Sequence, residues 1–359
     1  MGKQTIVPFG PQHPVLPEPI HLDLVLEDEK VVQAIPSIGF IHRGLERLAE
    51  KKEFADMVYV GERICGICSF IHSHGFSHAV EGAMKIEVPE RAQYLRVIWG
   101  EMSRIHSHLL WLGLMADSFG FENLFMHSWR VRERLLDVVE ATTGGRVIFG
   151  SCKVGGVRRD INEEAMAGVS KELREIEIMS QEITSLFEKD SSVKKRTVGV
   201  GVLSKEDAYL LGAVGPVLRA SGNASDMRML GYGAYGQLQF EPVVEKGGDC
   251  YARTMVRCRE VHQSFGLIRQ AIERIPAGPI EVKVTGTPTA EFFARLEQPR
   301  GEVIHYVKGN GTKFLERYRV RTPTFANVPP LVTMLAGCQL ADVPVIVLSI
   351  DPCISCTER

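Results

Sequence analysis

Two cysteine pairs near opposite ends of this chain constrain its fold more than any other feature. Cys65 and Cys68 form one C-x-x-C pair, and Cys353 and Cys356 form the other, close to the last residue. Chain ends fray unless contacts hold them in place. The apolar run 343–350, just before the second pair, is suited to burial. We therefore expect the last residues to be anchored inside the protein, so that the four thiols converge on one centre.

The composition is that of a soluble globular protein. The chain has 359 residues, of which 45% are hydrophobic and 24% charged, and its formal net charge is −2. This charge gives no electrostatic basis for binding nucleic acid. No apolar run reaches the roughly 18 residues that span a bilayer, and the first residues do not resemble a signal peptide. Eight cysteines without such a signal favour a reducing compartment, where paired thiols hold metal more often than they form disulfides.

Hydrophobic periodicity predicts an α+β fold that is mainly α. The patterns favour hairpins at 20–36, with its turn near 27–29, and at 301–322, around the turn 308–311. Helical patterns cover 43–60, 89–119, 129–141, 160–188 and 250–275. The pattern at 89–119 is apolar nearly all round, so we expect a central, buried helix. We expect one domain over residues 1–359, a bundle of long helices with small antiparallel sheets at its periphery.

The cysteine pairs have several chemical interpretations. One C-x-x-C pair fits a redox dithiol, half of a zinc site or part of an iron–sulfur site, and two pairs together fit structural zinc. Zinc pairs usually lie closer in sequence and stabilise small domains, which this long chain does not need. His72 also follows Cys68 by four residues. On a helix the two would share a face, so the imidazole could donate a hydrogen bond to a thiolate sulfur.

The segments RICGICSFIHSHG (63–75) and DPCISCTER (351–359) resemble the two signature motifs of the nickel–iron hydrogenase large subunit. Further segments resemble that family in the same order along the chain: 10–22, 42–46, 212–228, 297–302 and 321–327. Several of these blocks are shared with the 49-kDa subunit of respiratory complex I. The resemblance therefore points to the membrane-bound, energy-converting (Ech-type) hydrogenases and implies the hydrogenase large-subunit fold.

The resemblance implies a role for each motif cysteine. Cys65 and Cys353 would be terminal nickel ligands. Cys68 and Cys356 would bridge nickel to an iron that carries carbon monoxide and two cyanides. Soft thiolates suit both metals. The isolated cysteines, by contrast, are interpreted as small buried hydrophobes: Cys152, Cys250, Cys258 and Cys338.

Four other residues gain roles from the resemblance. Arg300 matches an arginine that lies over the open face of the metals, although Pro-Arg-Gly is also common in surface turns. Pro323 and Thr324 match the place where a hydroxyl bonds a cyanide; a threonine at a strand end is the alternative. Glu18 matches the glutamate that takes a proton from a nickel-bound thiolate; an exposed loop acid between two prolines is the alternative.

Glu46 matches a glutamate that, in other hydrogenases, binds a magnesium-type ion together with a C-terminal histidine. This chain has Arg359 at the histidine position. Because a guanidinium cannot ligate a metal, a salt bridge between Arg359 and Glu46 is the alternative to the ion. Five other histidines have no discriminating context and are interpreted as core or helix-face residues: His13, His74, His78, His106 and His108.

The function implied by the resemblance is reversible dihydrogen oxidation by the catalytic subunit of an Ech-type hydrogenase. No cysteine-rich cluster motif remains to carry electrons away. A small subunit with a 4Fe–4S cluster, ferredoxin reached through iron–sulfur subunits, and integral membrane ion-translocating subunits are therefore the expected partners. They would hold the chain on the cytoplasmic side of the cell membrane. A metal-free quinone-site subunit of the complex I type and a zinc-stabilised scaffold are the rival functions.

Overall fold

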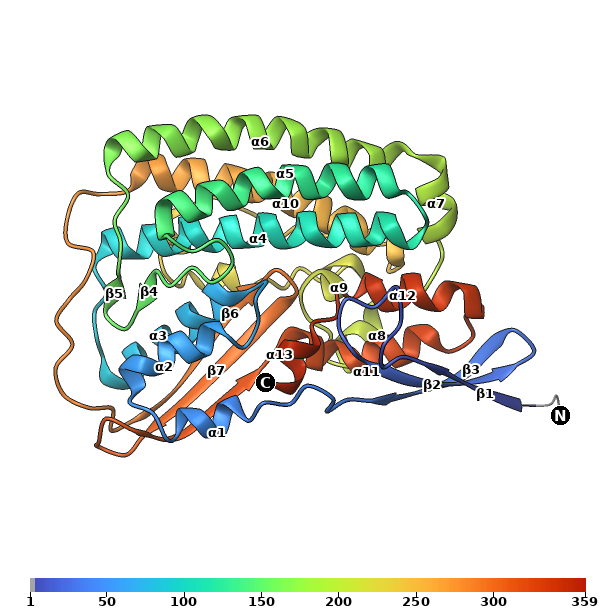
Figure 1. The fold of residues 1–359 in the computed structure, drawn as a ribbon, viewed down its shortest axis with the longest axis horizontal. Coiled ribbons are helices and arrows are strands. Elements are labelled where there is room, and N and C mark those ends of the chain that lie inside the picture. The colour runs from blue at the N-terminus through green and yellow to red at the C-terminus, as the bar shows by residue number, and fades with distance from the viewer. Residues whose placement is uncertain (1–3) are drawn as a thin grey trace.

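The computed structural model describes residues 4–359 and has two main layers (Figure 1). Four long helices lie side by side in the upper layer. Below them lie shorter helices and a three-stranded sheet, with a second three-stranded sheet at one end. No helix among residues 4–359 has the length and apolar composition needed to cross a membrane.

The four long helices form a bundle in which α4 packs against α5 and α10, and α6 packs against the latter two. Their bounds are α4 Glu90–Ser118, α5 Glu122–Thr143, α6 Glu163–Lys189 and α10 Cys250–Arg274. The predictions at 89–119, 160–188 and 250–275 are confirmed within three residues, whereas α5 begins seven residues before the predicted 129. The side chain of Asn162 caps α6 and that of Asp249 caps α10. As predicted, α4 is buried nearly all round.

Both predicted hairpins are present, and each gains a third strand that the sequence patterns missed. The N-terminal sheet has the antiparallel order β1 (Gln4–Phe9), β2 (His21–Glu27) and β3 (Lys30–Ser37). The second sheet has the order β6 (Glu291–Gln298), β7 (Gly301–Gly309) and β8 (Leu315–Arg321). A two-stranded ribbon joins β4 (Cys152–Lys153) to β5 (Gly156–Val157). These small sheets and the long helices confirm the predicted fold class.

The predicted helix 43–60 is interrupted. It consists of α1 (Leu45–Ala49) and α2 (Phe54–Glu62), followed by α3 (Ser69–Met84). Between α1 and α2, Glu53 has an extended backbone and pairs with Phe314, and the amide of Phe54 donates to the carbonyl of Lys313. Contacts with the turn between β7 and β8 therefore override the local helical pattern.

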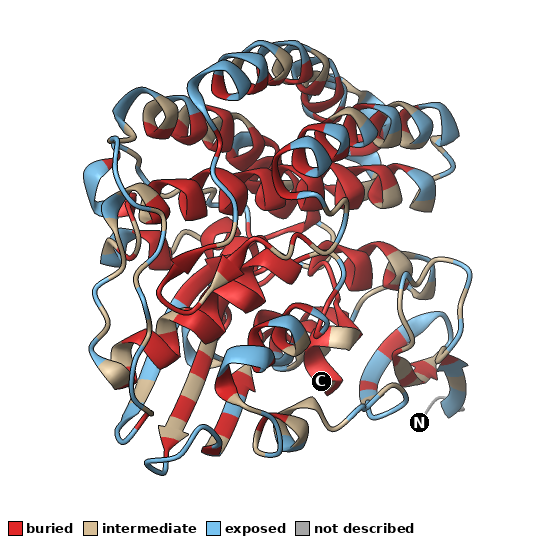
Figure 2. Cartoon of the chain, turned by 60° about the vertical axis from the view of Figure 1, so that its left-hand side comes forward, coloured by how far each residue is buried: buried red, intermediate tan, exposed pale blue. Residues whose placement is uncertain are grey.

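The last part of the chain is folded into the molecule. In Figure 2 the ribbon that leads to the C-terminus is buried, and the run 343–350 before it is almost wholly buried, as predicted. The C-terminal helices are α11 Pro323–Leu335, η3 Leu340–Asp342, α12 Val343–Ser349 and α13 Ile354–Glu358. The remaining short helices are α7 Ser191–Thr197, α8 Lys205–Leu210, α9 Gly215–Ala220, η1 Met227–Leu230 and η2 Tyr235–Gln237.

A buried ionic cluster fixes the inner end of β6. Arg104 of α4 donates to the carbonyls of Glu297 and Gln298, at 2.9 and 3.1 Å. Arg219 of α9 pairs with the carboxylates of Glu297 and Glu260, at 2.8 and 2.7 Å. Burial and the nearby charge of Asp226 raise the pKa of Glu297 to about 7. Buried charges are tolerated only when paired in this way, so the cluster holds the residues just before Arg300 in one position.

The turn after β6 also requires a glycine from a distant segment. Gly215 has φ +64°, and a Cβ there would lie 2.3 Å from the carbonyl oxygen of Arg300 and from the Cα of Gly301. Gly212 has a similar φ of +68° with open space around it. Only the first glycine therefore combines a left-handed backbone with a close approach to the Arg300 turn.

We expect Gly215→Ala to destabilise the protein more than Gly212→Ala. Both variants place an alanine in the left-handed region, at about 1–2 kcal/mol, but only Gly215→Ala also pushes against the Arg300 turn. Denaturant unfolding of the two variants measures the difference. Equal losses of stability would show that the turn can move away at no cost.

Candidate metal centre

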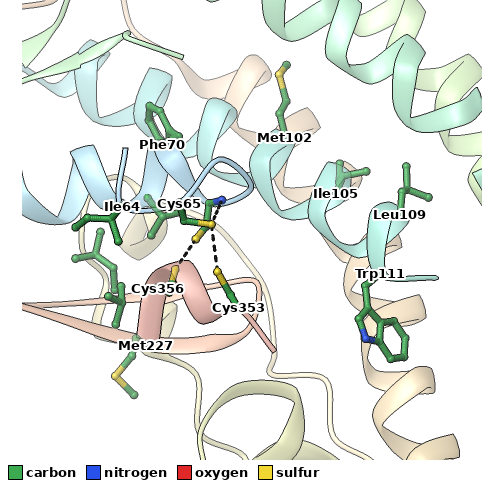
Figure 3. Packing of buried hydrophobic residues seen from close by; sticks show 14 of the residues in the cluster. Ile64, Cys65, Phe70, Met102, Ile105, Leu109, Trp111, Met227, Cys353 and Cys356 are labelled. Atoms are coloured by element: carbon green, nitrogen blue, oxygen red, sulfur yellow. Dashed lines mark hydrogen bonds between the residues drawn. The ribbon is translucent and has the colours of Figure 1, made fainter. Parts of the chain in front are cut away.

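The four motif cysteines come together in the interior. Cys65 and Cys68 lie in the turn between α2 and α3, Cys353 precedes α13, and Cys356 lies within it. All four are at most 2% exposed. The sulfurs of Cys65 and Cys353 are 3.4 Å apart, as are those of Cys68 and Cys356. Figure 3 shows Cys353 and Cys356 pointing toward Cys65 from the C-terminal segment. In the structure, the four thiols therefore converge as predicted.

Hydrogen bonds from the segment 39–43 hold α13 against the first cysteine pair. The guanidinium of Arg43 donates to the carbonyls of Ile64 and Ser355, at 2.7 and 3.0 Å. The carboxylate of Glu358 accepts from the amides of Gly39 and Ile41. Arg43 therefore links the two cysteine segments directly, and the contacts of Glu358 keep the last helical turn in place.

The thiols perturb one another because they are buried and in contact. Burial opposes ionisation of Cys68, but hydrogen bonds from the other three thiols outweigh it and lower the pKa of Cys68 well below its ordinary value. Burial and the same neighbours raise the pKa of Cys356 well above the ordinary value. The pKa values of Cys68 and Cys356 are thus shifted in opposite directions, and a bound cation would displace the protons that remain on such thiols.

The spacing of the sulfurs bears on which metal the site could hold. A closed zinc site with four thiolates keeps all sulfurs about 3.8 Å apart, given tetrahedral zinc–sulfur bonds of about 2.3 Å. Here the sulfurs of Cys65, Cys68 and Cys356 lie within 4.8 Å of one another, and Cys353 is outside that set. The four sulfurs form a compact set of soft donors, which suits thiophilic metals.

Arg300 lies beside the cysteines, on the turn between β6 and β7. It is 2% exposed, and its guanidinium pairs with the Asp351 carboxylate at 2.9 Å and donates to the Asp351 carbonyl at 3.0 Å. A longer contact of 3.4 Å joins it to the hydroxyl of Ser107. Burial alone would lower the pKa of Arg300, but Asp351 and the thiols raise it well above its ordinary value. The alternative of a surface arginine is therefore wrong.

Glu18 reaches the site from the loop between β1 and β2. Its carboxylate accepts hydrogen bonds from the amides of Ile354 and Ser355 and from the Ser355 hydroxyl, the latter at 2.6 Å. One carboxylate oxygen lies 4.0 Å from the sulfur of Cys353. Glu18 is only half-buried, so it stands between the sulfur and the outside of the molecule. An exposed loop acid without partners is not what the structure contains.

Thr324 and Pro323 begin α11 and are fully buried. The Thr324 hydroxyl oxygen accepts from the amide of Cys353 at 3.1 Å. Thr324 therefore supports a cysteine segment directly, from the start of a helix rather than from a strand end.

His72 contacts the second cysteine pair rather than the first. Its Nε2 lies 3.3 Å from the sulfur of Cys356 and 3.1 Å from the side-chain amide nitrogen of Gln298. Its Nδ1 lies 3.4 Å from Nε2 of His305. The helical spacing thus predicted a contact between imidazole and sulfur, but could not indicate that the sulfur belongs to Cys356.

Glu46 forms the ion pair that was the alternative to a magnesium site. Its carboxylate accepts from Nε of Arg359 at 3.0 Å, from the guanidinium of Arg319, and from the amide of Val320 at 2.9 Å. Two guanidinium groups occupy the positions where a cation would bind. These residues therefore do not fit a magnesium ion.

The cysteines without a motif are part of the core or its edge. Cys152 and Cys250 are fully buried, and burial raises the pKa of Cys152 to about 11 and that of Cys258 to about 12. Neutral, buried thiols agree with their interpretation as hydrophobes. Among the histidines, His108 bonds Glu260 at 2.9 Å. His106 is a fully buried residue of α4, as interpreted, but its ring nitrogens have no hydrogen-bond partner among the described residues.

Several site residues were not singled out from the sequence. Arg43 and Asp351 stand inside matched motifs, which was the available signal, but their partners are distant in sequence. Gln298 also stands inside a matched segment, 297–302, whereas Ser107 and His305 carry no local signal of their role. Their contacts arise only when α4, β6 and β7 meet around the cysteines.

Comparison with known protein families gives two matches. Residues 118–287 and 282–359 match the family described as respiratory-chain NADH dehydrogenase, 49 Kd subunit. Residues 43–116, which include the first cysteine pair, match the family described as nickel-dependent hydrogenase.

Individual relatives cover almost the whole chain. The carbon monoxide-induced hydrogenase of Rhodospirillum rubrum is 40% identical, over 98% of this chain and 99% of that protein. The membrane-bound hydrogenase subunit alpha of Pyrococcus furiosus is 39% identical, over 98% of this chain and 87% of that protein. A chain in the structure of the membrane-bound sulfane sulfur reductase, an archaeal respiratory membrane complex, superposes with a TM-score of 0.94 at 33% identity. That superposition covers 99% of this chain and 98% of the other.

The ion pairs of Glu46 should stabilise the protein at neutral pH, and this contribution to stability should decrease at acidic pH. Burial opposes its ionisation, but the bonds from Val320, Arg359 and Arg319 outweigh burial and lower its pKa below the ordinary 4.5. A lowered folded-state pKa gives stability that is complete above the unfolded-state pKa and is lost as the pH falls through the folded-state value. We expect Glu46→Gln to lower the denaturant midpoint by a constant amount from pH 7 to about pH 5. The difference should shrink at lower pH, and one that grows on acidification would contradict the charge assignment.

Proposed function

The chain belongs to the family of nickel–iron hydrogenase large subunits of the membrane-bound, energy-converting group, related to the complex I 49-kDa subunit, and we propose that it catalyses reversible dihydrogen oxidation. The observation that carries this proposal is the arrangement of four buried thiols in two touching pairs. Neither a quinone-site subunit nor a redox dithiol requires four converging cysteines.

The proposed cofactor is nickel plus an iron carrying carbon monoxide and two cyanides. Cys65 and Cys353 would be the terminal nickel ligands, and Cys68 and Cys356 would hold both metals. When bound, the metal pair supplies the cleavage of dihydrogen into two protons and two electrons. The sulfurs lie 3.4 Å apart in both pairs, Cys65 with Cys353 and Cys68 with Cys356, which supports a common site for all four ligands.

The surrounding residues would orient the ligands and move protons. Glu18 would take the proton from the Cys353 sulfur, with its carboxylate held by Ser355. Arg300, kept charged by Asp351, would place a fixed cation beside the anionic diatomic ligands. Thr324 would donate to a cyanide, because its oxygen already accepts from Cys353 and its hydrogen has no acceptor among residues 4–359.

Electron transfer and energy conversion would require other subunits. The cysteines outside the motifs are isolated and do not form a cluster site in the part of the chain that the structure describes. A small subunit with a 4Fe–4S cluster, ferredoxin reached through iron–sulfur subunits, and integral membrane ion-translocating subunits are the proposed partners. The names of the membrane-bound relatives support the membrane partners of this assembly. The chain would lie at the cytoplasmic side of the membrane.

The match to the NADH dehydrogenase subunit favours one alternative, a metal-free subunit at a quinone site. Metal analysis and infrared spectroscopy of the purified complex separate the two functions. A hydrogenase contains nickel and iron and gives bands from iron-bound carbon monoxide and cyanide. A quinone-site subunit gives neither, and zinc alone would indicate a structural site.

We expect Cys68→Ser or Cys356→Ser to abolish hydrogen uptake and block assembly of the metal pair. A hydroxyl does not replace a thiolate that binds two soft metals. Cys258→Ser, at a buried cysteine without a ligand role, is the matched control and should keep nickel, iron and activity. Full nickel content and uptake in either ligand variant would overturn the assignment.

Glu18→Gln should lower turnover by about 10²–10⁴-fold, the usual contribution of a general base. Glutamine keeps the size and hydrogen bonding of the side chain but cannot take up a proton. Metal content and infrared bands should be unchanged, and Glu29→Gln, at an exposed turn, is the control. Wild-type turnover in Glu18→Gln would place the first proton acceptor elsewhere.

A further inference from the structure

A line of buried side chains extends from Cys356 to β8, the edge strand of the sheet β6-β7-β8. After His72, Nδ1 of His305 on β7 lies 2.9 Å from the hydroxyl of Tyr318 on β8. His72, His305 and Tyr318 are all 0% exposed. The line thus joins α3, β7 and β8 without contact with solvent.

The hydroxyl of Tyr318 sets the direction of these hydrogen bonds. Within residues 4–359, its one partner is Nδ1 of His305. A buried hydroxyl hydrogen needs an acceptor, so Tyr318 donates and Nδ1 of His305 carries no hydrogen. Burial lowers the pKa of His305 well below its ordinary value, which keeps the ring neutral. Its one ring hydrogen must then be on Nε2, and that hydrogen points at Nδ1 of His72.

The same reasoning fixes His72. Because its Nδ1 accepts from His305, its own hydrogen is on Nε2 and points at the sulfur of Cys356, 3.3 Å away. The side chain of Gln298 agrees with this after one change. Its Oε1 has no partner, while its Nε2 faces Nε2 of His72. With the amide oxygen and nitrogen exchanged, Oε1 lies beside Nε2 of His72 and shares its hydrogen with the sulfur of Cys356.

Packing of the surrounding residues restricts the positions of the His305 and Tyr318 rings. A Cβ at Gly75 of α3 would lie 2.5 Å from the His305 ring. The ring of Phe76 packs edge-on against Tyr318 at 5.3 Å between centroids. The two rings beyond His72 are therefore held in place by packing as well as by hydrogen bonds.

We propose that His305 and Tyr318 are positioning residues whose one-way relay, through His72, keeps a hydrogen bond aimed at the sulfur of Cys356. The inference rests on the proposed function, since it gives this hydrogen bond a metal-bridging thiolate as its target. Each donor in the relay polarises the next. The relay therefore withdraws electron density from this sulfur and tunes the metals it binds.

The first test needs no metal. The full chain is labelled with ¹⁵N-histidine, and the His305 and His72 signals are identified by their loss in His305→Gln and His72→Gln. Nitrogen shifts distinguish protonated from unprotonated ring positions. We expect unprotonated Nδ1 and protonated Nε2 in both rings. A hydrogen on Nδ1 of His305 would overturn the relay, whatever metal the protein binds.

The second test uses the assembled complex. Tyr318→Phe removes the hydroxyl and keeps the ring against Phe76. Tyr306→Phe, at a partly buried tyrosine bonded to Glu291, is the matched control. We expect the infrared carbon monoxide band to move to lower frequency in Tyr318→Phe only, because more electron density reaches the iron. Unchanged bands would overturn the proposal. Absence of any such bands in the wild type would instead overturn the proposed function, and the nitrogen shifts would still decide the relay.

Discussion

The structure depends on the attachment of α13 to the turn that carries the first cysteine pair. The two segments lie far apart in sequence, and closing such a long loop costs conformational entropy. Arg43 bridges Ile64 and Ser355, and Glu358 and Arg359 hold the last turn from both sides. Without these contacts the segment that carries the second cysteine pair would fray. With them, the core closes around four thiols.

The environment around the thiols is charged as well as buried. Arg300 is held by Asp351, and the residues before it are held by the ionic cluster that includes Arg104 and Glu297. A buried cation must be compensated, and at this site the compensation comes partly from Asp351 and partly from the thiols. Metal binding would convert more thiols to thiolates, so the positive charge of Arg300 becomes more favourable as the site fills.

The sequence predicts the long helices well because their burial follows a regular period over many residues. Prediction from the sequence fails where the interacting residues lie far apart along the chain. The pattern at 43–60 cannot reveal that Glu53 pairs with Phe314, and β1 and β6 need neighbours that only the folded chain supplies. At the site, paired cysteines predict convergence, and the motifs predict the positions of Glu18 and Arg300. His305 could not be found, because nothing near it in sequence indicates that its ring meets His72.

The two cysteines of α13 have opposite neighbours, and this asymmetry links the geometry to the proposed chemistry. Cys353 faces the carboxylate of Glu18, an acceptor that is half-buried and therefore open to proton exchange with the outside. Cys356 faces His72, whose ring hydrogen points inward from a fully buried relay. A sulfur beside an acceptor can pass on a proton, whereas the fixed donor beside Cys356 favours its thiolate against the burial and neighbouring thiols that raise its pKa. In the proposed function, proton transfer would thereby be directed to Cys353, and Cys356 would remain a metal ligand.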